Sequence, residues 1–168
     1  YGDEFVSLYE KYEKEMPNLE KIKARELMSK IIEAQIETGQ PYMLYKDSIN
    51  NKSNQKNIGV IKSSNLCAEI VEYSDKTETS VCNLASIALP KFVKKVKNKK
   101  IKEYDFKALY KTAKLATKNL DEVIDINFYP TDKTEISNSK HRPIGLGIQG
   151  LADVFFELEI AYDSDEAK

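Results

Sequence analysis

The stretch SNLCAEIVEYSDKTETSVCNLASIALPKFV, residues 64–93, carries both cysteines of the chain, Cys67 and Cys82. Within it, SVCNLASIAL at 80–89 is a mostly apolar run bounded by polar segments, and its length predicts a strand buried on both faces. The residues around Cys67 mix apolar and polar types without a clean period, which is typical of a loop. The stretch therefore predicts one cysteine on a strand and the other on a loop.

Helical, extended and irregular patterns alternate on both sides of this stretch. The predicted segments are a helical part at 1–40, a loop segment at 41–79, a strand at 80–93, a helix at 104–126, and a strand followed by a helix at 143–160. Polar residues over 46–57 and 130–142 predict loops. Strands that alternate with helices indicate an α/β fold.

Composition excludes several classes of protein. The 168 residues include 41% hydrophobic and 32% charged residues with a net charge of −1, so the chain can bury a core and has no general affinity for nucleic acid. Seven lysines between 91 and 102 lack interleaved aromatic residues and predict a solvated turn. No apolar run approaches the roughly 18 residues of a membrane span. The opening YGDEFVSLYEKY has no initiator Met and no signal-peptide pattern, so we expect an excised piece of a longer cytoplasmic protein.

The two cysteines and His141 are the residues of the chain best suited to metal or thiol chemistry. They are too few for a disulfide scaffold and are not spaced like a zinc site, so we expect no bound metal. Cys67 lies in Asn65-Leu66-Cys67-Ala68-Glu69, where an extended backbone would project the amide, the thiol and the carboxylate the same way. The alternative is a buried cysteine in an ordinary loop, as in a helical interaction domain. Cys82 alone fits a small hydrophobic core residue equally well.

A second hypothesis rests on three glycines, Gly145-x-Gly147-x-x-Gly150, which follow a predicted strand and precede a predicted helix. This spacing is found in dinucleotide-binding oxidoreductases, where the phosphates lie at a helix N-terminus. That fingerprint also requires an acidic residue about 20 residues further on and a second strand. The chain ends 18 residues after Gly150, so glycines that allow close packing of strand and helix explain the pattern better.

The stretch 64–93 resembles the active-site segment of the class I ribonucleotide reductase large subunit, of the eukaryotic type. The flanking sequences ETGQPYMLYKDSINNKSNQKNIGVIKSSNLC and HRPIGLGIQGLADVFFELEI are similar to the same family, so the resemblance covers essentially the whole chain. It implies a fragment of a ten-stranded α/β barrel with a finger loop, within 41–79, and surrounding helices. It also implies that the fold brings Cys67 and Cys82 near each other.

The resemblance implies a role for each matching residue in the radical reduction of ribonucleoside diphosphates. Cys67 would become a thiyl radical, because ribose C3′–H is not acidic enough for base chemistry, and Glu69 would act as general base and acid. Asn65 would orient the substrate hydroxyls and Glu69, and Leu66 would also contact substrate. Cys82 would be redox-active, with a partner cysteine outside this chain.

The resemblance also implies what the complete enzyme needs. These requirements are a radical from a metal-containing small subunit, ATP and deoxynucleotide effectors, self-association of the large subunit, and thioredoxin or glutaredoxin as reductant. No cofactor is expected to bind the 168 residues themselves. We therefore expect the isolated chain to be inactive.

Overall fold

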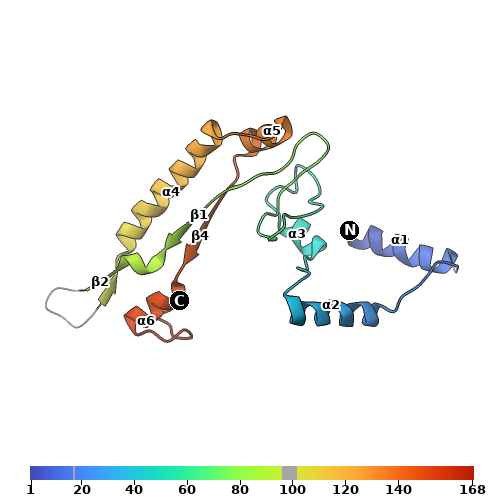
Figure 1. Ribbon diagram of the computed structural model, residues 1–168, viewed down its shortest axis with the longest axis horizontal. Helices are drawn as coiled ribbons and strands as arrows, with labels where there is room; N and C mark the ends of the chain where they lie inside the picture. Colours follow the sequence, from blue (N-terminus) through green and yellow to red (C-terminus); the bar gives the residue numbers. More distant parts are fainter. Residues whose placement is uncertain (17, 96–101) are drawn as a thin grey trace. The chain divides into compact units, whose positions relative to one another are not determined.

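The computed structural model describes residues 1–16, 18–95 and 102–168, and the chain forms two compact units, Tyr1–Asp75 and Lys76–Lys168. Figure 1 labels the helices of both units and the strands β1, β2 and β4 of the second. In the described part of the chain, no helix is both long and apolar enough to span a membrane. Residues 96–101, half of the lysine-rich turn predicted at 91–102, lie outside the described residues.

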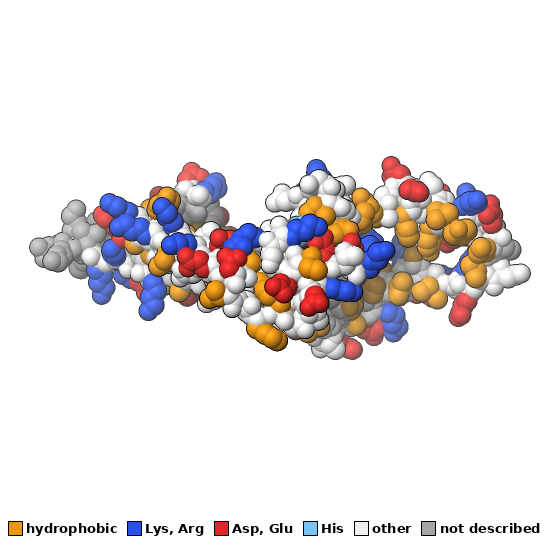
Figure 2. Space-filling model, turned by 90° about the horizontal axis from the view of Figure 1, so that it is seen from above, with side chains coloured by type: hydrophobic (Ala, Val, Ile, Leu, Met, Phe, Trp, Pro, Cys, Tyr) orange, Lys and Arg blue, Asp and Glu red, His pale blue; other side chains and the backbone are white. Residues whose placement is uncertain are grey.

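The first unit opens with two amphipathic helices, α1 (Gly2–Glu15) and α2 (Ala24–Thr38), as the sequence pattern predicts. Helix α2 ends at Gly39, whose φ of 76° is the left-handed conformation that glycine adopts at helix ends without strain. Neither helix contains a buried residue. Their apolar stripes are exposed, and Figure 2 shows hydrophobic side chains gathered on the surface of the N-terminal helices, at the right of the view.

A third helix, α3 (Lys46–Lys52), occupies a segment for which the sequence predicts a loop, and that prediction is wrong. The helix is held by Asn50, which is buried. Its side-chain amide donates to the carbonyl of Ile61 at 3.0 Å, and its side-chain oxygen accepts from the Ile61 N–H at 2.8 Å. This reciprocal pair of hydrogen bonds fixes a polar segment whose composition favours a turn.

The second unit contains a parallel pair of strands, β1 (Asn83–Ala88) and β4 (Ile144–Gln149). Their register aligns Asn83 with Ile144 and Ala88 with Gln149. Parallel strands need a long crossover, and here the connection includes the long helix α4 (Phe106–Ile126), which packs against both strands. Figure 1 shows α4 running alongside the pair.

Shorter elements complete the second unit. A 3-10 turn, η1 (Leu89–Phe92), follows β1, and β2 (Val93–Lys95) pairs antiparallel with β3 (Lys102–Tyr104). The remaining helices are α5 (Asp132–His141) and α6 (Leu151–Leu158). The buried centre of the core consists of Ile87, Leu89, Phe92 and Val154, with α4 residues packed against it.

Two predictions for this unit need correction. The strand expected over 80–93 spans only Asn83–Ala88, because Pro90 lies in the 3-10 turn that follows. It is buried on one face only, since Ile87 is in the core while Leu84 is 55% exposed. The loop expected over 130–142 is mostly helix α5, whose N-terminus is capped by the Thr131 side chain.

The α/β class is confirmed, and the described residues form two separate two-stranded sheets and no closed barrel. Small separate sheets are what we expect of a fragment that holds only some of the strands of a barrel. A barrel closes only when every strand has two neighbours. Here β1 and β4 each have a single strand neighbour among the described residues.

Candidate functional site

Cys67 lies at the exposed tip of a short turn, as predicted. The turn is closed at its base by three hydrogen bonds. The Ala68 N–H donates to the Asn65 carbonyl at 3.1 Å, the Ile70 N–H donates to the Asn65 side-chain oxygen at 3.0 Å, and the Ser64 hydroxyl donates to the Ile70 carbonyl at 2.5 Å. All three bonds join residues within 64–70, so the turn is stabilised by its own residues.

Ala68 adopts a φ of 65°, in the left-handed region that side chains other than glycine rarely enter. Such a conformation costs an alanine roughly 1–2 kcal/mol. It reverses the chain immediately after Cys67. The strained residue is therefore next to the thiol, where a functional site would hold it.

Asn65 and Glu69 flank the thiol on the exposed part of the turn. The side-chain oxygen of Asn65 accepts from Ile70 and from the Ser64 hydroxyl, the latter at 3.3 Å. Among the described residues, the Asn65 side-chain NH₂ and the Glu69 carboxylate have no hydrogen-bond partner. Asn65 thus has a structural use for its oxygen and an available donor, and Leu66 beside it is 88% exposed.

Cys67 and Ala68 line an open cavity of about 540 Å³ within the first unit. Its other walls come from helix α2 and from the segment that follows it: Met28, Gln35, Gly39, Pro41, Tyr42, Met43, Leu44 and Tyr45. The Gln35 side chain donates to the Pro41 carbonyl at 2.7 Å and ties that segment to α2. Apolar and aromatic side chains form most of the wall of this open cavity. An exposed thiol at a cavity disfavours the alternative of an incidental buried cysteine.

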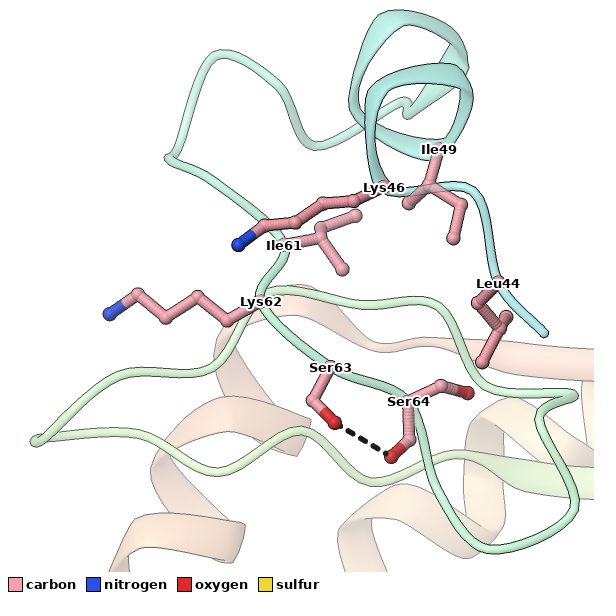
Figure 3. Close-up of a pocket in the computed structure, with 7 residues that line it drawn as sticks. All are labelled: Leu44, Lys46, Ile49, Ile61, Lys62, Ser63 and Ser64. Carbon is pink, nitrogen blue, oxygen red and sulfur yellow. Dashed lines mark hydrogen bonds between the residues drawn. The ribbon is translucent and has the colours of Figure 1, made fainter. Parts of the chain in front are cut away.

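A second hollow of about 250 Å³, which also has Leu44 in its lining, is drawn in Figure 3. Leu44, Ile49 and Ile61 form its apolar wall, and the ammonium groups of Lys46 and Lys62 extend in a common direction at its rim. Ser63 and Ser64 complete the lining, and the Ser63 hydroxyl donates to the Ser64 carbonyl at 3.3 Å. Ser64 therefore both lines this hollow and closes the Cys67 turn through its hydrogen bond to the Ile70 carbonyl.

Cys82 lies in the second unit, one residue before β1 rather than on it as predicted. Its thiol is half-buried. A Cβ built on Gly145 would lie 3.7 Å from the Cys82 sulfur and 2.5 Å from the Leu84 side chain, so Cys82 and Leu84 share one face of the strand pair. Because the two cysteines lie in different units, the expectation that they meet in the barrel stays a prediction.

Sequence reasoning missed a buried ionic cluster just before Cys82. Glu78 is the only buried charged residue in the described part of the chain, at 3% exposure. Its carboxylate lies 3.1 Å from His141 Nε2 and accepts from Lys140 at 3.2 Å. The available signals were the single histidine of the chain and an acidic residue four positions before a cysteine, but nothing in the sequence connects them.

The three glycines of the dinucleotide hypothesis do not form a phosphate-binding turn. Gly145 and Gly147 lie inside strand β4, paired with β1, rather than in a loop after a strand. Gly150 precedes α6 with a φ of 75°, and a Cβ there would lie 2.7 Å from the ring of Pro90. Gly150 is thus required by its positive φ and its close contact with Pro90, whereas Gly145 and Gly147 are strand residues, and the geometry does not favour the alternative. The described residues also contain no group of three or more acidic, cysteine or histidine side chains that could hold a metal ion.

The structure is thus an α/β domain with an exposed cysteine on a turn beside a cavity and a second cysteine immediately before a parallel strand. The family model for the ribonucleotide reductase barrel domain matches residues 1–168, and the chain belongs to this family. This confirms the resemblance found in the sequence.

Relatives at high identity cover the whole chain. The chain is 53% identical over 168 residues to the ribonucleoside-diphosphate reductase large chain of Schizosaccharomyces pombe. It is 55% identical to the large subunit of Plasmodium falciparum and 54% identical to large chain 2 of Saccharomyces cerevisiae, each over 168 residues. These matches cover 100% of this chain but only 20%, 20% and 19% of the respective relatives. The chain thus spans about a fifth of their length.

Proposed function

We propose that this chain is part of the catalytic barrel of a ribonucleoside-diphosphate reductase large subunit, which makes deoxyribonucleoside diphosphates for DNA synthesis. The observation that carries the proposal is the exposed Cys67 thiol, on a braced turn beside a cavity, in a chain of this family. The cavity would receive part of the diphosphate substrate. The large-subunit names of the relatives support the same activity.

Cys67 would begin the reaction as a thiyl radical. A radical delivered from a metal-containing small subunit would oxidise the thiol, and the sulfur would then take the hydrogen atom from ribose C3′. The chain's own residues would position the sulfur and exclude side reactions. The turn that braces Cys67 suits this role, because a radical centre must be held within a fraction of an ångström of its target.

Glu69 and Asn65 would act on the hydroxyls of the ribose, Glu69 as a base and Asn65 as a hydrogen-bond donor. Glu69 would accept the 3′-OH proton, and the 2′-OH would leave as water after gaining a proton. The Asn65 side-chain NH₂ would donate to the substrate, since its side-chain oxygen already accepts within the turn. Leu66, beside them, would contact the substrate through its apolar side chain.

Cys82 would supply the electrons with a partner cysteine elsewhere in the subunit. Two thiols would become one disulfide, and the two electrons and two protons released would balance the loss of the 2′-oxygen as water. The hydrogen atom would return from Cys67 to C3′. Thioredoxin or glutaredoxin would then reduce the disulfide. We further propose a cytoplasmic enzyme that self-associates and responds to ATP and deoxynucleotide effectors.

The test uses the full-length subunit that contains this chain, mixed with its small subunit and a dithiol reductant. Deoxynucleoside diphosphate should form with the unaltered protein, while Cys67→Ser should form none and still bind nucleotide, because an alcohol cannot take the radical role. Substantial turnover by Cys67→Ser would overturn the proposal. The isolated 168-residue chain should show no turnover, since it lacks a partner for Cys82.

A further inference from the structure

The buried cluster around Glu78 lies close in sequence to Cys82, and its carboxylate pairs with two residues of one helix. Lys140 Nζ donates to both carboxylate oxygens, at 3.4 and 3.2 Å, and His141 Nε2 lies 3.1 Å from one of them. Both residues belong to the last turn of α5. The next residue, Thr79, donates its N–H to the carbonyl of Lys133 in the first turn of the same helix, at 3.1 Å. Residues 78 and 79 are therefore fixed on α5 at two points.

Cys82 lies between this anchor and the strand pair. Only residues 80–82 separate Thr79 from Asn83, the first residue of β1, which aligns with Ile144. Helix α5 ends at His141, and β4 begins at Ile144. The segment that carries Cys82 is thus attached at both ends to the same stretch of chain, α5 and the start of β4.

Within β1 itself, a single buried side chain, Ile87, favours the observed alignment. A slip of one residue in strand pairing turns every side chain to the opposite face, and a strand with one apolar and one polar face resists such a slip. In NLASIA, apolar residues point to both faces, with Ile87 in the core and Leu84 on the other face. A one-residue slip would replace Ile87 in the core with Ser86 or Ala88, and it would also move Cys82 away from the face it shares with Leu84 and Gly145.

A buried carboxylate is a poor way to gain stability, because its desolvation offsets much of its pairing energy. It is a good way to fix one alignment, because its hydrogen bonds are directional and a displaced carboxylate would be left buried without partners. The carboxylate side chains of Asp105 and Asp125, which pair with Lys94 and Arg142, are 21% and 62% exposed, against 4% for Glu78. Glu78 is thus set apart by burial and by its place four residues before Cys82.

We propose that Glu78, held by Lys140 and His141, is a positioning residue for Cys82 that fixes the alignment of β1 with β4 and so the face on which the thiol lies. This inference rests on the proposed redox role of Cys82 and adds to it a device that sets the direction of the sulfur. His141 and Lys140 act through Glu78, and none of the three contacts the substrate. The disulfide with the partner cysteine forms only when the Cys82 sulfur lies on the correct face.

The experiment uses the full-length subunit with its small subunit and compares Glu78→Gln with Asp125→Asn. The first variant keeps the shape of the buried side chain and removes its charge. The second removes an exposed ion pair of 2.8 Å to Arg142, the residue after His141, and serves as the matched control. Steady-state kcat with a dithiol reductant, KM for the diphosphate, and the alkylation rates of Cys67 and Cys82, followed by peptide mass spectrometry, are measured for each.

Glu78→Gln should lower kcat by about ten-fold or more, because displacement of a reacting group by an ångström carries a cost of that order or larger. The KM and the alkylation rate of Cys67 should stay at the wild-type values, while the alkylation rate of Cys82 changes. A general loss of structure would alter both thiols and the KM. Asp125→Asn should match wild type in every measurement.

His141→Asn provides a second variant in case Glu78→Gln does not fold, and it should give the same pattern with a smaller fall in kcat. If either variant folds and keeps both the wild-type kcat and the wild-type Cys82 alkylation rate, the positioning role is wrong. Cys82→Ser separates this result from a failure of the proposed function. Full turnover by Cys82→Ser would refute the redox role, while the alkylation rates would still report whether Glu78 positions the sulfur.

Discussion

Cys67 and Cys82 are held by different kinds of structure. The side-chain hydrogen bonds that close the Cys67 turn link residues five and six positions apart. Those that anchor the segment before Cys82 link residues 62 and 63 positions apart. A locally braced turn can keep its form when its surroundings change, whereas a segment held by distant partners depends on the whole unit. The two proposed steps, radical attack and electron supply, should therefore respond differently to the same perturbations.

The largest expected difference between the cysteines concerns the first chemical step. In the full-length enzyme, Cys67→Ser should slow substrate-dependent decay of the small-subunit radical by at least about 10³-fold, whereas Cys82→Ser should allow it. The reason is that hydrogen abstraction from C3′ needs the Cys67 sulfur and precedes electron supply. Electron paramagnetic resonance follows the radical, and substrate deuterated at C3′ should slow its decay in Cys82→Ser. Equal decay in the two variants would remove the distinction between the cysteines.

The next effect concerns the base beside Cys67. Glu69→Gln should lower kcat by about 10²–10⁴-fold, because the amide cannot accept the 3′-OH proton. Glu37→Gln, an exposed residue of α2 in the same unit, should leave kcat unchanged and is the control. Measurement of deoxynucleotide formation with saturating diphosphate gives both values. An activity of Glu69→Gln within a factor of about two of wild type would assign the proton transfer to another group.

A smaller effect should follow from loosening the Cys67 turn without touching the thiol. Ser64→Ala removes the hydroxyl that donates to the Ile70 carbonyl at 2.5 Å, and we expect kcat to fall by about ten-fold as Cys67 gains freedom. Ser63→Ala is a close control, because the Ser63 hydroxyl reaches only its neighbour's carbonyl at 3.3 Å. Hydrogen exchange of residues 64–70 should rise in the first variant alone. Equal kcat values for the two variants would show that the local brace is unimportant.

The same contrast between local and distant contacts explains what the sequence can predict. Helix α4 is evident because its apolar stripe repeats over 21 residues, and the Cys67 turn is evident because its residues lack any period. Helix α3 is hidden because its polar sequence is stabilised by one amide, Asn50, bonded to a residue 11 positions away. The contact between Glu78 and His141 leaves no trace in either local pattern, since 63 positions separate the two residues.

The smallest effect tests whether the unit that holds Cys82 depends on distant packing. Gly150→Ala should destabilise the second unit by about 2 kcal/mol, because an alanine in the left-handed region is strained and its Cβ would lie 2.7 Å from Pro90, 60 positions earlier. Gly147→Ala is the control. Its Cβ would have ordinary contacts of 3.7 and 3.8 Å, and alanine in place of a strand glycine should be neutral or stabilise by up to about 0.5 kcal/mol.

Hydrogen exchange in the full-length subunit measures the local stability of each unit separately. Gly150→Ala should speed exchange in β1 and β4 while helix α2 in the first unit exchanges as in wild type. If α2 and the Cys67 turn loosened equally, the two cysteines would not differ in how they are held, and the contrast between a local brace and a distant anchor would fail.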